Sequence, residues 1–121
     1  GEDCTAIQVC EPQAVDFRMS YRVGSRHPVT AGAAGIAILA ARPATTSDGA
    51  AVTEARRLGY SLTRGELQKG AVGIASALLG ATADPLPFEA CVGVVAMEDL
   101  DSERCAHLVT ACARDLAAAL A

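Results

Sequence analysis

The residues of this chain that could do acid–base chemistry are few and far apart in the sequence. His27 precedes a proline in a polar segment, and His107 falls on the polar side of the last stretch with helical periodicity. The spacing brings no serine, cysteine or carboxylate next to either histidine, so no triad or thiol–imidazole pair is expected. We therefore expect no catalytic residues and interpret both histidines as solvated surface side chains.

Acidic side chains gather just before the last helical segment. They are Glu98, Asp99, Asp101 and Glu103. Negative charge in the first turn of a helix is stabilised by the helix dipole, so the cluster has a structural explanation. Because the chain holds only two histidines and no Cys-x-x-Cys pair, we expect neither a metal site nor a cofactor.

The chain has five cysteines, and no two of them have the spacing of a Cys-x-x-Cys motif. They are Cys4, Cys10, Cys91, Cys105 and Cys112. We expect free thiols that act as small hydrophobic side chains rather than a disulfide scaffold. A small enzyme with a reactive thiol at Cys91 or Cys10 is the catalytic alternative, although no electropositive or helix-capping context marks either residue.

A glycine-containing segment at residues 24–35 could hold an anion. It lacks the Lys-Ser/Thr pair of a Walker loop, and Gly32-Ala-Ala-Gly35 is too short for a dinucleotide fingerprint. A helix that starts after a strand still presents free N–H groups and a partial positive charge. We therefore predict an anion-binding helix start here, with close packing as the alternative explanation of the small residues.

The periodicity of the chain predicts the elements that must position these groups. Strands are expected at residues 4–11, 15–23, 60–62, 72–79 and 90–97. Helices are expected at residues 31–41, from a cap at Ser47 or Asp48 to Gly59, and after a cap at Asp101 or Ser102. The apolar face expected for the last helix consists of Cys105, Leu108, Val109, Cys112, Leu116 and Leu120. This order predicts an α+β domain with a mainly antiparallel sheet and flanking helices.

Length and charge limit what such a domain contacts. The 121 residues suffice for one domain, with 51% hydrophobic residues and a mean hydropathy of +0.29. A net charge of −4 and only four aromatic residues argue against a nucleic-acid-binding surface. The longest apolar run, residues 33–41, is too short to span a bilayer, and no signal peptide is evident. We expect a cytoplasmic fragment of a longer protein, without membrane contact.

Three blocks of sequence carry a resemblance. Residues 21–41, YRVGSRHPVTAGAAGIAILAA, resemble the segment of IclR-family transcriptional regulators that reads vGsrlPlhatalGkAlLA. Residues 55–75, ARRLGYSLTRGELQKGAVGIA, are similar to that family's vRrqGyavsrgEl.pGv.giAap, and residues 111–121 are similar to its closing helix. The three blocks follow one another in register over nearly the whole chain.

The resemblance implies that residues 1–121 form the effector-binding domain of such a regulator, with a GAF-like α+β fold. A winged helix-turn-helix would then contact DNA from outside this chain. The implied partners are a small organic acid or a related apolar metabolite, and further copies of the domain in a homodimer or tetramer. The strand expected at residues 15–23, with Arg18 and Arg22 on its polar side, is the predicted contact surface.

The resemblance also implies where the effector would lie. Backbone donors at the helix start match Ala33 and Ala34, and the polar position after the Gly-Tyr pair matches Thr63. Glycine or valine stands at three positions where relatives often carry Cys or small hydroxyl side chains. The implied effector-binding residues are Ala33, Ala34, Thr63, Gly73, Gly93 and Val95. Glycines here predict empty volume for a larger, more apolar effector. The alternative is a GAF-like dimerisation module that has lost effector binding.

Overall fold

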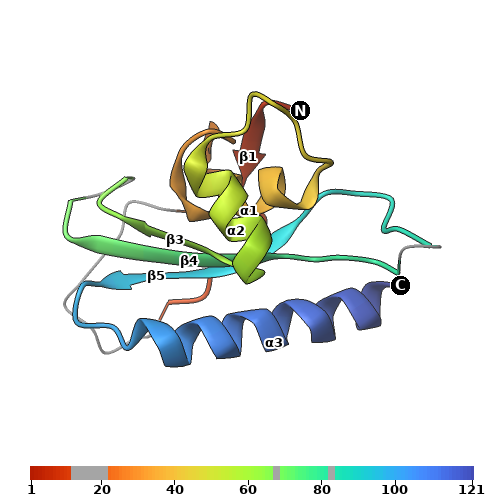
Figure 1. Cartoon of the computed structure of the whole chain (residues 1–121). Helices are drawn as coiled ribbons and strands as arrows, with labels where there is room; N and C mark the ends of the chain where they lie inside the picture. Colours follow the sequence, from red (N-terminus) through yellow and green to blue (C-terminus); the bar gives the residue numbers. More distant parts are fainter. Residues whose placement is uncertain (12–21, 67–68, 82–83) are drawn as a thin grey trace.

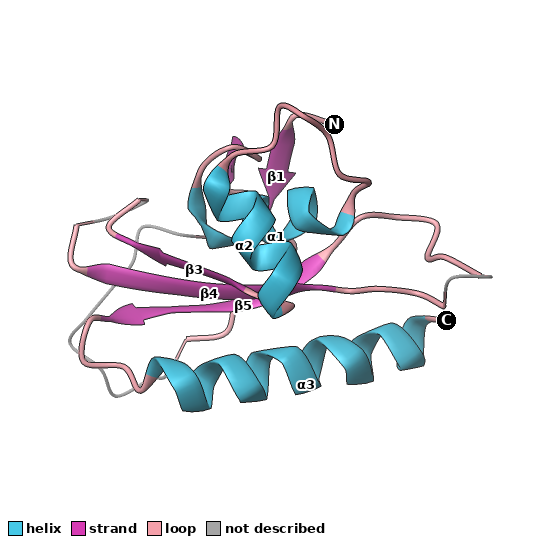
Figure 2. Ribbon diagram, viewed as in Figure 1, coloured by secondary structure: helices cyan, strands magenta, loops and turns pink. Residues whose placement is uncertain are grey.

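The computed structural model describes residues 1–11, 22–66, 69–81 and 84–121 of the chain. Within them, a three-stranded antiparallel sheet lies between helices on its two sides (Figures 1 and 2). The long helix α3, Ser102–Leu120, runs along one face of the sheet, and α1, Gly32–Ala41, packs on the other. The α+β class and the mainly antiparallel sheet expected from the sequence are confirmed.

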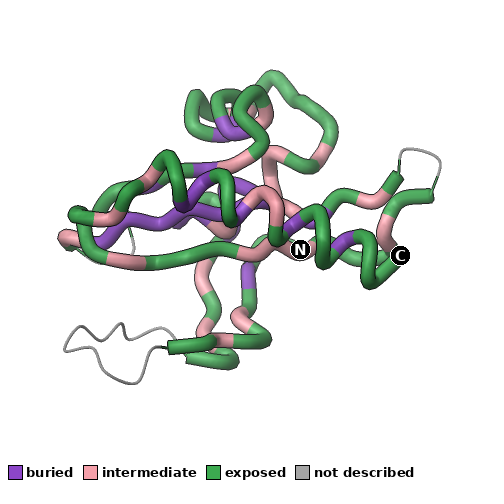
Figure 3. The backbone as a smooth tube through the Cα atoms, turned by 90° about the horizontal axis from the view of Figure 1, so that it is seen from below, coloured by how far each residue is buried: buried purple, intermediate pink, exposed green. Residues whose placement is uncertain are grey.

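The central strand of the sheet carries most of the core. It is β4, Ala71–Ala77, paired with β3, Ser61–Arg64, on one side and with β5, Cys91–Met97, on the other. Val72 and Ile74 are each 1% exposed and pack against α3, whereas Ala75 packs against α1. Because β4 is covered on both faces, its residues 71–75 form a continuous apolar run, and Figure 3 shows buried residues along the centre of the sheet.

A second, smaller sheet differs from expectation. Strand β1, Asp3–Thr5, pairs with β2, Arg26–Pro28, although no strand was expected at residues 26–28. Strand β1 ends well short of residue 11, so the strand expected at residues 4–11 is wrong over most of its length. The proline is tolerated because it ends a short strand, where a missing donor costs little. Of the strand expected at residues 15–23, residues 15–21 lie outside the described residues, and Arg22 and Val23 are not in a strand.

Helix α2, Ala50–Leu58, packs against α1 through Ile36, Val52 and Ala55. It ends at Gly59 with φ of +87°, as the sequence predicts, because glycine adopts this left-handed conformation without a Cβ clash. The expected cap at Ser47 or Asp48 is wrong, since Gly49 is the N-cap and no side chain caps it. Asp48 instead accepts the Thr45 N–H at 2.9 Å.

Helix α3 begins at the predicted cap. The Asp101 side chain accepts the Arg104 N–H at 3.2 Å. The face that meets the sheet is shifted from the expected one. It consists of Cys105, Ala106, Val109, Ala113 and Ala117. Leu108, Leu116 and Leu120 are 62%, 39% and 54% exposed, so they lie outside the face of α3 that the sheet covers. None of the described helices is long and apolar enough to cross a membrane.

Candidate functional site

The strand register brings three of the six predicted effector residues into one row across the sheet. Thr63 of β3 stands opposite Gly73 of β4, which stands opposite Val95 of β5. Residues paired in this way point to the same face. A Cβ built on Gly73 would lie 3.0 Å from Thr63 Oγ1 and 3.1 Å from Ala33 Cβ. Ala33, Thr63 and Gly73 therefore meet beneath the first turn of α1.

The empty volume expected at Gly73 and Gly93 is not present. At Gly73 the space is closed by Thr63 and Ala33, as those short distances show. At Gly93 a Cβ would lie 2.7 Å from the carbonyl oxygen of Ile74 and 3.0 Å from Ala75 Cβ. The expectation that these glycines leave empty volume is wrong, because each permits a close approach between neighbouring elements.

Accessible surface next to the helix start lies instead over β5. Val95 is 38% exposed and Met97 is 42% exposed, and Gly93 is also exposed. These alternate residues share the α1 side of the sheet, because Val95 lies in the row of Thr63 and Gly73. We call Gly93, Val95 and Met97 the β5 shelf. Within the described part of the chain it is an open surface rather than an enclosed cavity.

The start of α1, which the sequence predicts to bind an anion, already binds a carboxylate of this chain. The N–H of Gly32, the first residue of α1, donates to Glu66 Oε1 at 3.0 Å. The preceding N-cap, Ala31, has no side chain that could cap the helix. The sequence reasoning missed Glu66. The lack of a capping side chain at Ala31 signals that an acceptor must come from elsewhere, but local pattern does not say which one.

Thr63 is the polar side chain nearest to this helix start. The residue is 8% exposed, and its hydroxyl makes no hydrogen bond with the described residues. No buried side-chain oxygen of the described residues lacks a partner, so the hydroxyl oxygen of Thr63 itself keeps some contact with solvent. Thr63 thus offers a hydroxyl, beside Ala33 and Gly73, that a ligand or water can engage.

Ser61 is a second polar residue that the sequence reasoning did not single out as part of the site. Its hydroxyl lies 2.6 Å from the Ala33 carbonyl oxygen and 3.3 Å from that of Ala75. It therefore ties the first turn of α1 to β3 and β4. This side chain sets the distance between the helix start and the sheet.

Cys91 borders the site but is unsuited to nucleophilic chemistry. Its Sγ donates to the Ala34 carbonyl at 3.7 Å, and the residue packs against Ala33, Ala37 and Ala75. Desolvation by burial raises the pKa of Cys91 to about 11. A thiol with this pKa is protonated at neutral pH, so the reactive-thiol interpretation of Cys91 is not supported. The described residues contain no group of three His, Cys, Asp or Glu side chains that could hold a metal ion.

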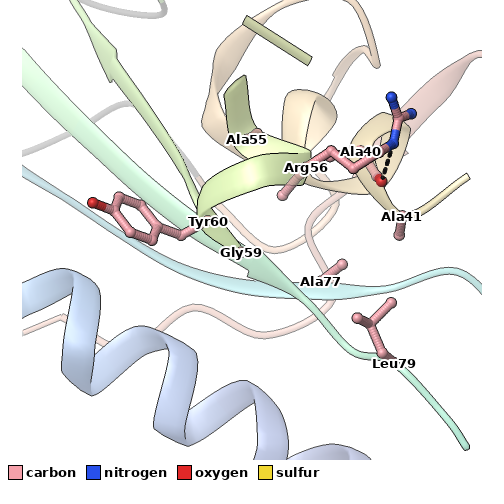
Figure 4. A pocket seen from close by; sticks show the side chains of 9 residues that line it. Ala40, Ala41, Ala55, Arg56, Gly59, Tyr60, Ala77 and Leu79 are labelled. Carbon is pink, nitrogen blue, oxygen red and sulfur yellow. Dashed lines mark hydrogen bonds between the residues drawn. The ribbon is translucent and has the colours of Figure 1, made fainter. Parts of the chain in front are cut away.

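Two open hollows of the described surface lie away from the predicted residues. One, of about 70 Å³, lies between α1, α2 and β4 beside Ala55 and Ala77 (Figure 4). Its labelled Arg56 reaches to the Ala40 carbonyl at 3.1 Å. The other, of about 310 Å³, lies beyond the C-terminal end of α1, beside Phe88. None of the six predicted effector residues lines either hollow.

The rim of the larger hollow is held by an ion pair. Arg42 Nε lies 2.6 Å from Glu89 Oε2, and a second nitrogen lies 2.9 Å from Oε1. The hydrogen bonds from Arg42 hold the pKa of Glu89 below its usual value. This pair connects the end of α1 to the segment that enters β5, which gives the charges there a structural role.

Comparison of the sequence with known proteins finds no match. No protein-family model matches it, and no curated protein matches it either. Comparison with solved structures does find neighbours. An IclR transcriptional regulator from Alicyclobacillus acidocaldarius superposes with a TM-score of 0.76 at 19% identity, over 97% of this chain and 56% of that one.

Two further solved structures have a similar fold. The C-terminal domain of E. coli transcriptional regulator KdgR has a TM-score of 0.65 at 18% identity, over 81% of this chain and 74% of that one. An IclR homolog from Microbacterium hydrocarbonoxydans, solved with 4-hydroxybenzoate, has a TM-score of 0.68 at 19% identity, over 86% of this chain and 50% of that one. The chain thus spans about half the length of two of these proteins. The Alicyclobacillus and E. coli proteins are transcriptional regulators. Its fold is that of the C-terminal domain of an IclR-type transcriptional regulator.

Proposed function

We propose that this chain is the effector-binding domain of an IclR-family regulator, working in the cytoplasm without catalysis. It would bind a small organic acid or a related apolar metabolite and alter how a separate domain of the protein binds DNA. The observation that carries the proposal is the meeting of Ala33, Thr63 and Gly73 at the start of α1. The neighbour that holds 4-hydroxybenzoate supports a ligand of this size.

The proposed binding site combines that helix start with the β5 shelf. The N–H groups of Ala33 and Ala34 belong to the first turn of α1 and have no acceptor within the helix. Thr63 supplies a hydroxyl, and Val95 supplies exposed apolar surface in the same row of the sheet. Gly93 lies on the shelf beside Val95. An oxygen of the ligand would face the helix, and its apolar body would cover the shelf.

Ligand-induced stabilisation tests this proposal directly. Thermal unfolding is measured with small aromatic and aliphatic acids and with their neutral amides. A ligand present at 100 times its dissociation constant adds about 2.7 kcal/mol to the free energy of unfolding. If no compound of these classes raises the melting temperature, the proposed effector binding is wrong.

A matched pair of variants locates the site. Val95 and Val94 are neighbours on opposite faces of β5, and they are 38% and 37% exposed. Val95→Phe should abolish the stabilisation by covering the shelf, whereas Val94→Phe should preserve it. Gly93→Leu would not serve, because its Cβ would strike the Ile74 carbonyl and disturb the sheet itself. An unchanged ligand response in Val95→Phe would place the site elsewhere.

The alternative function, a dimerisation module without an effector, is favoured by two observations. The spaces at Gly73 and Gly93 are closed, and Glu66 occupies the first donor of α1. This alternative predicts self-association with no response to any ligand. The thermal measurements therefore decide between the two functions.

We also propose that the domain pairs with a second copy of itself through α3. Four residues at spacings of four form a stripe along this helix and are all exposed: Leu108, Cys112, Leu116 and Leu120. In an antiparallel pair of helices centred on this stripe, Leu108 of each copy would face Leu120 of the other, and Cys112 would face Leu116. The stripe is therefore complementary to itself, which favours a second copy as the occupant.

Sedimentation velocity tests this pairing. Leu108→Asp with Leu116→Asp should convert a dimer to a monomer, whereas Arg114→Asp, on the opposite side of α3, should not. A monomeric parent protein at high micromolar concentration would contradict the proposal. The contact surface expected earlier at residues 15–23 lies outside the described residues, apart from Arg22 and Val23.

A further inference from the structure

We draw no further inference here: the strongest candidate, the open apolar hollow of about 310 Å³ beyond the C-terminal end of α1, carries none, because Arg42 at its rim is already paired with Glu89 and nothing in the structure shows what covers the hollow.

Discussion

Gly35 lets α1 pack closely against the segment that precedes it. A Cβ at this position would lie 2.2 Å from the carbonyl oxygen of Val29, which is backbone and cannot rotate away. Gly35→Ala should therefore push α1 off the segment before it and lower the free energy of unfolding by roughly 1–3 kcal/mol. Urea denaturation measures this change.

The control for this substitution is another glycine of the same helical layer. Nothing lies within 4 Å of a Cβ built on Gly49, which is the N-cap of α2. Serine is preferred at such a position, so Gly49→Ser should be neutral or stabilising. A Gly35→Ala protein as stable as the parent would show that the close contact with Val29 is not required.

Cys91 gives a prediction about alkaline pH. Burial raises the pKa of its thiol from 9.0 to about 11, so the folded state holds the proton more tightly than the unfolded chain. The stability that this contributes is complete below pH 9.0 and is lost as the pH rises through about 11. Cys91→Ala should therefore reduce the fall in the free energy of unfolding across this range.

The raised pKa of Cys91 also predicts how fast its thiol reacts. Iodoacetamide at mildly alkaline pH should modify the exposed Cys10 and Cys112 and spare Cys91, because the thiolate is the reactive form. Peptide mass spectrometry follows each site separately. Modification of Cys91 in the native protein at the rate of Cys112 would contradict its assigned burial.

At the scale of the elements, Arg56 of α2 completes the C-terminal end of α1. Its guanidinium donates to the carbonyls of Leu39, Ala40 and Arg42 at 3.1–3.3 Å and pairs with Asp48 at 3.1 Å. These carbonyls lie at the C-terminal end of the helix, where carbonyl oxygens lack an N–H donor from a following turn of the helix. Arg56→Gln should lower the free energy of unfolding by roughly 1–3 kcal/mol.

The next residue in the chain is a control with the same chemistry. Arg57 is 68% exposed and pairs only with Glu54 of its own helix among the described residues. Arg57→Gln should leave stability almost unchanged, because exposed ion pairs contribute little. Equal losses from the two substitutions in thermal or urea unfolding would refute the capping role of Arg56.

At the scale of the whole molecule, the net charge predicts that this domain does not bind DNA by itself. The net charge is −4, so a phosphate backbone is repelled rather than attracted over a broad surface. The 121-residue chain should show no shift of duplex DNA in a gel assay at physiological salt. Submicromolar binding that weakens with added salt would contradict this prediction and would assign a DNA contact to this domain itself.

The sequence alone was sufficient for the class of fold and for most of the elements. Helical and alternating periodicity follow from local geometry, so the helices and the strands of the main sheet could be found within a residue or two of their bounds. Gly59 and Asp101 were identifiable as helix ends because capping acts between residues close in sequence. The resemblance to IclR regulators placed Thr63 and Gly73 at one site, and the strand register brings them together.

Only the tertiary structure decided what surrounds those residues. Whether a glycine leaves a cavity or permits a close contact depends on the neighbouring element, and at Gly73 and Gly93 the neighbour fills the space. Periodicity found the apolar side of α3 but could not tell its covered part from the exposed stripe, because the contact of the helix with the sheet decides which side chains are covered. Glu66 reaches Gly32 from thirty-four residues away, and a contact between such distant residues is determined by the packing of whole elements, which no local pattern encodes.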